Sequence, residues 1–261
     1  MKGFLHFMST EVTNRFADRV DNYIQYRPHY PQELFDFLLV ENIIIKNSVV
    51  ADIGSGTGIS SEPFLKMNLN VFGIEPNKEM RQAAENLLKD YKKFKSVEAS
   101  SENTTLENNS VDVIVAGQAF HWFDREKTKK EFKRILKPNG QVILMWNDRR
   151  TDTTDFLKSY EDFLQLCGTD YKAVNHKNTQ DKKIFEDFFG GTFKEKWFYN
   201  FQDADFTGLK GRVLSSSYMP NEGHKDYEHM MNCLKKVFVR YQQKGTVRLD
   251  YDTKIYYGHL N

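Results

Sequence analysis

Between residues 31 and 150, short apolar runs alternate with amphipathic stretches of helical period, which is the pattern of a parallel sheet built from alternating strands and helices. Five strands are predicted here, at Val49–Ile53, Val71–Ile74, Phe94–Glu98, Val111–Ala116 and Gln141–Trp146. Four helices are predicted, at Pro31–Val40, Ser60–Met67, Lys78–Asp90 and Arg125–Leu136, the last stopped by Pro138 and Gly140.

The pattern changes after Trp146. A polar, helix-rich stretch covers Asp152–Phe189, an extended segment follows at Phe193–Phe201, and Lys225–Tyr241 has the period of a helix. From Val247 to Tyr257 apolar and polar residues alternate at every second position, which predicts a strand. The two late strands suit an antiparallel addition to the sheet edge, with the helices between them forming a lid. We therefore expect an α/β fold with seven strands, mostly parallel, the last antiparallel.

Charge and cysteine content limit the classes of partner. The 37 Lys and Arg residues nearly balance 36 Asp and Glu residues, so no global field attracts nucleic acid, and the Lys89–Lys95 run is read as a solvated helix end. Cys167 and Cys233 lie far apart with no paired spacing, which argues against a metal site or a secreted disulfide framework. No apolar run is long enough for a signal or a membrane span. We expect a cytoplasmic monomer or weak dimer without metal, membrane or nucleic-acid partners.

A glycine cluster follows the first strand. Gly54, Gly56 and Gly58 recur at every second residue, whereas a pyrophosphate loop requires G-x-G-x-x-G and would need a glycine at Ile59. No Gly-Lys-Ser/Thr follows, so a P-loop is excluded. The loop therefore favours a nucleoside ligand, the alternative being a tight turn that binds nothing.

An acidic residue, Glu75, closes the second strand 23 positions after Asp52. A carboxylate at this point can accept hydrogen bonds from both ribose hydroxyls, as in NAD and S-adenosylmethionine sites. Ribose binding is thus the inference common to both ligands.

Four segments carry a resemblance to a known family: Val50–Gly58, Gly73–Pro76, Ala116–Asp124 and Leu136–Gly140. They resemble class I S-adenosylmethionine-dependent methyltransferases, in the small-molecule branch that includes trans-aconitate methyltransferase-like proteins. Weaker similarity extends to Tyr26–Pro31, Ser215–Tyr218 and Ile255–Gly258. The resemblance implies a Rossmann-like fold in one domain over 1–261, with cofactor-covering helices in 1–45, a cofactor-binding core in 46–150 and a helical lid with the last strands in 151–261.

The resemblance also implies which residues bind S-adenosylmethionine. Glu75 takes the ribose and Pro76 packs on the adenine, but Ser100 stands where the family usually has an acid, so adenine contact falls to Ser100 and the Ser101 amide. The other expected contacts are Asp52, Gly54, Ser55 and Gly56 at the methionine end, Gln118 and Ala119 through carbonyls, Trp122 near the transfer region, and Tyr26 and Arg27 from the covering segment.

The acceptor has fewer signals. If it is a hydroxyl or amine, His121 is the nearest base, although a histidine beside aromatic residues is also typical of a packed core position. If it is a carboxylic acid, Arg27, Arg149, Arg150 and Arg212 are candidate anion ligands, the alternative being solvated arginines.

We therefore expect methyl transfer from S-adenosylmethionine to a small molecule, with a carboxylic acid as one candidate acceptor. A second hypothesis is that the protein is a non-catalytic sensor that binds S-adenosylmethionine. A nicotinamide-dependent oxidoreductase is a third hypothesis. It would keep the Glu75 ribose contact, but it needs a glycine spacing that this loop lacks.

Overall fold

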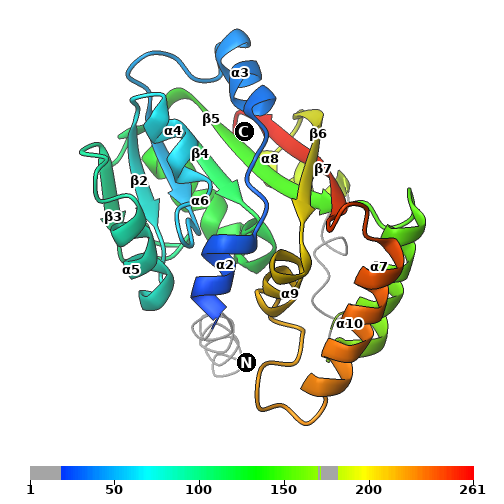
Figure 1. Ribbon diagram of the computed structural model, residues 1–261. Coiled ribbons are helices and arrows are strands. Elements are labelled where there is room, and N and C mark those ends of the chain that lie inside the picture. The colour runs from blue at the N-terminus through cyan, green and yellow to red at the C-terminus, as the bar shows by residue number, and fades with distance from the viewer. Residues whose placement is uncertain (1–18, 170, 172–181) are drawn as a thin grey trace.

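The protein is built on one seven-stranded sheet with the spatial order β3-β2-β1-β4-β5-β7-β6 (Figure 1). The computed structural model describes residues 19–169, 171 and 182–261. Strands β1 to β5 are parallel, and β7 runs antiparallel to both its neighbours, β5 and β6. The predicted sheet class is confirmed. The strands are β1 Val49–Ile53, β2 Asn70–Ile74, β3 Phe94–Val97, β4 Val111–Gly117, β5 Leu136–Arg149, β6 Lys194–Ala204 and β7 Val247–Gly258.

Helices connect the strands and form the lid. Side-chain caps start several of them: Asn77, Asp124 and Thr154 each accept a backbone N–H from the first turn of the helix that follows. The helices described are α2 Val20–Tyr26, α3 Gln32–Val40, α4 Ser61–Lys66, α5 Lys78–Leu87, the 3₁₀ helix η2 Phe120–Trp122, α6 Arg125–Ile135, α7 Asp155–Cys167, α8 Lys182–Phe189, α9 Phe206–Leu214 and α10 Tyr227–Tyr241.

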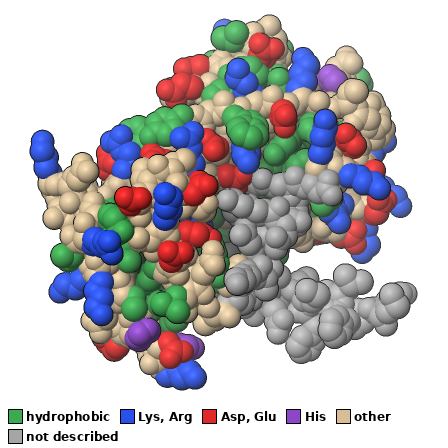
Figure 2. All heavy atoms as spheres, turned by 90° about the vertical axis from the view of Figure 1, so that its right-hand side faces the viewer, with side chains coloured by type: hydrophobic (Ala, Val, Ile, Leu, Met, Phe, Trp, Pro, Cys, Tyr) green, Lys and Arg blue, Asp and Glu red, His purple; other side chains and the backbone are tan. Residues whose placement is uncertain are grey.

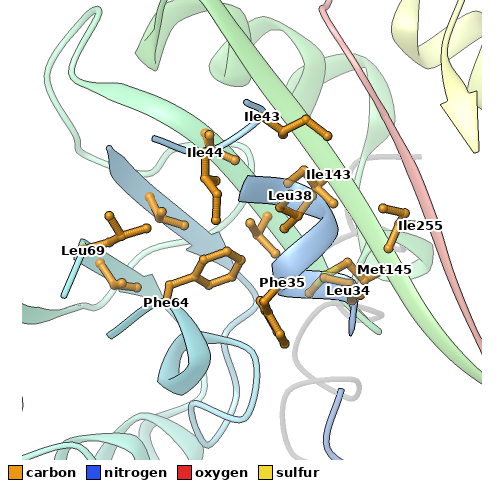
Figure 3. Close-up of a cluster of buried hydrophobic side chains, with 14 of the residues drawn as sticks. Leu34, Phe35, Leu38, Ile43, Ile44, Phe64, Leu69, Ile143, Met145 and Ile255 are labelled. Carbon is orange, nitrogen blue, oxygen red and sulfur yellow. The ribbon is translucent and has the colours of Figure 1, made fainter. Parts of the chain in front are cut away.

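Alternate residues of each central strand enter two different cores, because neighbouring side chains of a strand point to opposite faces. On one face Ile143 and Met145 of β5 pack with α3 and with Phe64 of α4 (Figure 3). On the other face Leu144 and Trp146 pack with α6 and α8. The central parallel strands are therefore buried on both sides, as parallel sheets require, whereas the edge strand β6 is largely exposed.

A third core belongs to the lid. Helices α7, α9 and α10 pack against the first half of β7, including Leu249 and Tyr251, while Ile255 and Tyr256 of the same strand lie in the two sheet cores. The strand thus ties the lid to the sheet, and α7 and α10 stand side by side in Figure 1.

Several predicted boundaries differ from the structure, and one helix was not predicted. Helix α6 ends at Ile135, and β5 begins at the next residue, so Pro138 and Gly140 lie within an extended segment that starts with a bulge opposite β4. Helix α5 stops at Leu87 and does not reach Asp90. Helix α9 was not predicted, because Gly208 and Gly211 lower its helix propensity, although the Asp205 side chain caps it.

Acidic and basic side chains are interspersed on the lid-side face shown in Figure 2. The mixture agrees with the formal net charge of +1. Within the described ranges no helix is both long enough and apolar enough to cross a membrane. Residues 1–18 of the expected cofactor-covering segment lie outside the description.

Candidate active site

The glycine loop crosses the carboxyl end of β1 in a left-handed conformation. Gly54, Gly56 and Gly58 have φ of +69°, +55° and +89°, values that residues with a side chain rarely adopt. A Cβ on Gly54 would lie 2.6 Å from the Cβ of Ala119, whereas a Cβ on Gly56 would have nothing within 4 Å. The loop is packed at Gly54 and open at Gly56, which leaves space there for a ligand.

Asp52 lies beneath this loop and does not line the cavity described below. Its side chain is fully buried, and its Oδ2 accepts hydrogen bonds from the hydroxyls of Ser60 and Ser61 at 2.7 and 2.6 Å. Its Oδ1 is buried without a hydrogen-bond partner among the described residues. Burial raises the pKa of the carboxyl to about 6, although the two serine hydroxyls act in the opposite direction.

Glu75 follows β2 and holds the loop from the other side. Its Oε2 accepts the backbone N–H of Gly56 at 2.9 Å, and its Oε1 accepts that of Asn77 at 2.8 Å. Burial raises the pKa of this carboxyl, and the two N–H donors counteract part of the effect. Each oxygen keeps a further lone pair, so both can accept a hydroxyl from a ligand.

A cavity of about 150 Å³ opens between the glycine loop and the lid. Its walls come from the loop, the segment before α3, the carboxyl ends of β4 and β5, and the lid. Of the expected cofactor residues, Gly54, Ser55, Gly56, Gln118 and Arg27 line it. The remaining lining residues are Tyr23, Pro28, Tyr30, Thr57, Ile59, Ser60, Gly117, Asn147, Arg149, Thr151, Tyr171, Arg212 and Tyr218.

Two half-buried arginines line the lid side of this cavity. Arg27 donates from Nη2 to the Ser215 carbonyl at 2.8 Å, while its Nε is buried without a partner among the described residues. Arg212 donates from Nη1 to the Ser216 hydroxyl at 3.1 Å. Burial, followed by the charge of Arg212, lowers the pKa of Arg27. No described acidic side chain pairs with either guanidinium, so an anion here would offset two partly buried positive charges.

The other two candidate arginines are already neutralised. Arg149 lines the cavity but forms an ion pair with Glu161, whose carboxylate also accepts the Tyr171 hydroxyl. Arg150 lies outside the lining and pairs with Asp252 at 2.7 Å. The fifth strand was predicted to end at Trp146, but β5 continues to Arg149, so Arg149 is its last residue and Arg150 follows it.

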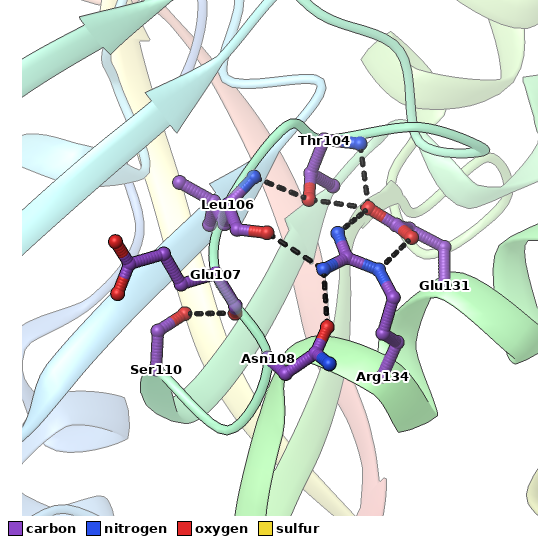
Figure 4. Close-up of polar contacts among 7 residues, drawn as sticks. All are labelled: Thr104, Leu106, Glu107, Asn108, Ser110, Glu131 and Arg134. Carbon is purple, nitrogen blue, oxygen red and sulfur yellow. Dashed lines mark hydrogen bonds and ion pairs between the residues drawn. The ribbon is translucent and has the colours of Figure 1, made fainter.

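The segment expected to meet the adenine is held by a polar cluster. Glu131 of α6 accepts both the backbone N–H and the hydroxyl of Thr104, at 2.7 and 2.6 Å, and pairs with Arg134, which also binds the Leu106 carbonyl (Figure 4). Arg134 holds the pKa of Glu131 at about 2. This cluster fixes the connection between β3 and β4, and with it Ser101, whose hydroxyl accepts from that of Thr128.

Several expected site residues lie outside the cavity lining. Ala119 packs against Gly54, and the ring of Tyr26 packs against Gly211 of α9. The ring centroids of His121 and Trp122 are 4.6 Å apart on η2. The full set outside the lining is Asp52, Glu75, Pro76, Ser100, Ser101, Ala119, His121, Trp122 and Tyr26. Their contacts with cofactor or acceptor remain predictions.

Sequence reasoning missed several polar wall residues. Asn147 donates to the Pro28 and His29 carbonyls at 3.3 Å, so it fastens the covering segment to β5. Tyr30 lies against Gly117, where a Cβ would come within 2.6 Å of its hydroxyl. Tyr171 and Tyr218 form an edge-on aromatic pair on the lid wall. Tyr30 and Tyr218 lie in two of the segments that resemble the family, and this similarity could have indicated that they belong to the site.

Comparison with known proteins agrees with this geometry. Residues 51–144 match the family model described as a methyltransferase domain. An uncharacterized methyltransferase-like protein of Schizosaccharomyces pombe is 32% identical over 158 residues, which make up 57% of each chain. An uncharacterized methyltransferase of Geobacillus is 30% identical over 145 residues, 52% of this chain and 67% of that protein.

Two more distant matches agree. The probable S-adenosylmethionine-dependent methyltransferase CRG1 of Saccharomyces cerevisiae is 24% identical over 193 residues, covering 71% of this chain and 65% of that protein. A solved structure from Anabaena variabilis has a TM-score of 0.60 at 19% identity, covering 90% of this chain and 99% of that one, which shows the fold alone.

The fold and the loop define a nucleoside-binding α/β protein of the methyltransferase type. The chain belongs to the class I S-adenosylmethionine-dependent methyltransferases. The matched part of the chain spans little more than half of the Schizosaccharomyces pombe relative.

Proposed function

We propose that this protein transfers a methyl group from S-adenosylmethionine to a small-molecule carboxylate. The observation that carries the proposal is the cavity that joins the glycine loop to Arg27 and Arg212, two half-buried guanidiniums with no described carboxylate partner. A positive charge that is partly withdrawn from water without a counter-ion is costly, so the cavity is suited to an anionic ligand.

The residues present fit the cofactor. The open space over Gly56 admits a ligand against the backbone, and the Glu75 oxygens have lone pairs left for the ribose hydroxyls. We assign the methionine end to the loop Gly54–Gly56 and to Gln118, all in the cavity wall. Pro76, Ser100 and Ser101 are proposed for the adenine end, with Ala119, Trp122 and Tyr26 around them.

S-adenosylmethionine supplies an activated methyl group on a sulfonium, so the protein chiefly has to align the acceptor and exclude water. Arg27 and Arg212 would hold one acceptor carboxylate, and Tyr23, Tyr30 and Tyr218 would close the cavity around it. A carboxylate is ionised at neutral pH and needs no general base. This agrees with the position of His121 outside the lining.

Transfer of labelled methyl to a panel of small mono-, di- and tricarboxylates tests the proposal, with the matching neutral amides as controls. We expect label in the acids only. Arg212→Gln should raise the acceptor KM about 10- to 100-fold, as expected for lost hydrogen bonds to a charged group, while S-adenosylhomocysteine affinity changes less than about twofold. Arg150→Gln, outside the lining, is the matched control and should behave as wild type.

Three outcomes contradict the proposal. Equal methyl transfer to the acids and to the amides would show that the acceptor need not be an anion. Firm S-adenosylhomocysteine binding with no transfer to any acceptor favours a sensor. Tight NADH binding without S-adenosylhomocysteine binding favours the oxidoreductase.

A further inference from the structure

Three side chains that can ligate a metal meet where α7 and α10 pack together. Cys167 is the last residue of α7, while His229 and Cys233 lie one turn apart on α10 and share one face of that helix. Their ligand atoms all lie within 4.8 Å of one another. The sequence predicted no metal site, because the cysteines are 66 positions apart and only the packing of the two helices brings them together.

The spacing is close to that of a metal-binding site. With Zn–S bonds of about 2.3 Å and Zn–N bonds of about 2.0 to 2.1 Å, a tetrahedral centre places sulfur and nitrogen ligands about 3.5 to 3.6 Å apart. The distance from Cys233 Sγ to His229 Nε2 is 3.6 Å. The Cys167 Sγ lies within 4.8 Å of both other ligand atoms, compared with about 3.8 Å between two sulfur ligands of a tetrahedral zinc.

The lid core supports the two cysteines of this cluster, and solvent reaches the cluster at His229. Cys167 and Cys233 are half-buried against the lid core, with Leu164 and Leu234 among its buried members. His229 is exposed, so a cation can enter from solvent and a water can occupy a fourth position.

Thiol nucleophile chemistry is a poor alternative use of this cluster. Burial, followed by the neighbouring Cys233, raises the pKa of the Cys167 thiol to about 11. A thiol with a raised pKa is a weak nucleophile, because the thiolate is the reactive form. A bound cation instead displaces the thiol protons into solvent.

We propose that Cys167, His229 and Cys233 form a structural zinc site with a water as fourth ligand. Two thiolates and an imidazole in tetrahedral geometry favour Zn²⁺ over oxygen-seeking cations such as Mg²⁺. The site would stabilise one wall of the cavity. Two residues after Cys167, the Thr169 backbone N–H donates to the Tyr218 carbonyl at 2.9 Å, and Tyr218 lines the cavity.

Cobalt titration of reduced, chelator-treated protein without oxygen tests the site. We expect one equivalent of Co²⁺ to produce near-ultraviolet thiolate charge-transfer and strong visible bands of tetrahedral coordination, and Zn²⁺ to remove both. Cys233→Ser and His229→Gln should weaken or abolish the bands. Zn²⁺ at a hundredfold excess over its Kd should raise Tm of the wild type by roughly 5 to 10 °C.

His259→Gln is the control, because this exposed histidine contacts the Gly140 carbonyl and belongs to no such cluster among the described residues. Its cobalt spectrum should match the wild type. Unchanged S-adenosylhomocysteine affinity in all variants shows that they fold. The proposal is overturned if wild type gives no bands, if Cys233→Ser keeps them, or if the two cysteines only form a disulfide on exposure to air. None of these readouts depends on methyl transfer, so failure of the proposed function leaves the test intact.

Discussion

At the scale of single residues, two buried carboxylates flank the glycine loop with different contacts. Glu75 accepts backbone N–H groups with both oxygens, whereas Asp52 uses one oxygen for two serine hydroxyls and has no described partner for the other. We therefore expect substitution of Glu75 to change ligand affinity and substitution of Asp52 to change the pH dependence of stability.

Glu75→Ala should weaken S-adenosylhomocysteine binding by about 1.5 to 3 kcal/mol, the range for hydrogen bonds to a charged group. The loop also loses the acceptor of the Gly56 N–H, so part of this loss comes from loop order. Calorimetric titration of both proteins measures the difference. An affinity equal to that of wild type would contradict the ribose role. Glu75→Gln keeps the side-chain shape and is the matched variant.

Asp52→Asn should change the pH dependence of stability. Because the folded-state pKa of Asp52 is raised to about 6, its neutral form stabilises the fold below about pH 4, and this contribution is lost as pH rises through about 6. The shift corresponds to about 3 kcal/mol. The unfolding free energy of Asp52→Asn relative to wild type should therefore increase between about pH 4 and pH 7, measured by urea denaturation at several pH values. If the unfolding free energies of wild type and Asp52→Asn changed in parallel with pH, Asp52 would not titrate in this range.

At the scale of elements, the contact between α2 and α9 positions the covering segment. A Cβ on Gly211 would lie 2.0 Å from a ring carbon of Tyr26, so α9 can approach α2 only with a glycine there. Arg27 directly follows α2 and Arg212 directly follows Gly211, so the two guanidiniums depend on this contact for their separation.

Gly211→Ala should destabilise the protein by about 1 to 3 kcal/mol through overpacking, despite the roughly 1 kcal/mol that alanine adds to helix propensity. Gly208→Ala in the same helix is the matched control. Its Cβ would make only 3.4 Å contacts with Ala204 and Asp205, so it should be neutral or stabilising. Urea denaturation compares the two. Equal stability of both variants would mean that α2 moves aside without cost.

At the scale of the whole molecule, β7 links every core. Its first half packs in the lid core with Leu249 and Tyr251, and its second half packs in the sheet cores with Ile255 and Tyr256. The lid therefore cannot separate from the sheet without exposing part of a central strand.

We expect the lid and the sheet to unfold in one cooperative thermal transition. Binding of the cofactor product should raise the Tm of this whole transition. At a hundredfold excess over Kd, S-adenosylhomocysteine should stabilise the fold by about 2.7 kcal/mol, or roughly 5 to 10 °C in Tm for a chain of this size. Scanning calorimetry with and without ligand gives the measurement. Two transitions, of which only one shifts, would show that the lid unfolds independently.

The sequence by itself determined the sheet and the family. Short apolar runs between helical stretches, together with the period-two alternation from Val247 to Tyr257, located the seven strands of the described residues. The glycine spacing with Glu75 indicated a ribose-bearing ligand, and the resemblance of short segments to a known family indicated S-adenosylmethionine, because these signals depend on local geometry and on short stretches of chain. It did not give α9, since Gly208 and Gly211 weaken the local helix signal, nor the start of β5 immediately after α6.

Only the tertiary structure distinguished among residues with similar sequence signals. Four arginines were equal candidates until packing paired Arg149 with Glu161 and Arg150 with Asp252, and left Arg27 and Arg212 without a described counter-ion. Cys167 and Cys233 became neighbours only when α7 packed on α10. Ion pairing and ligand clusters depend on distances between segments far apart in the chain, and folding alone sets those distances.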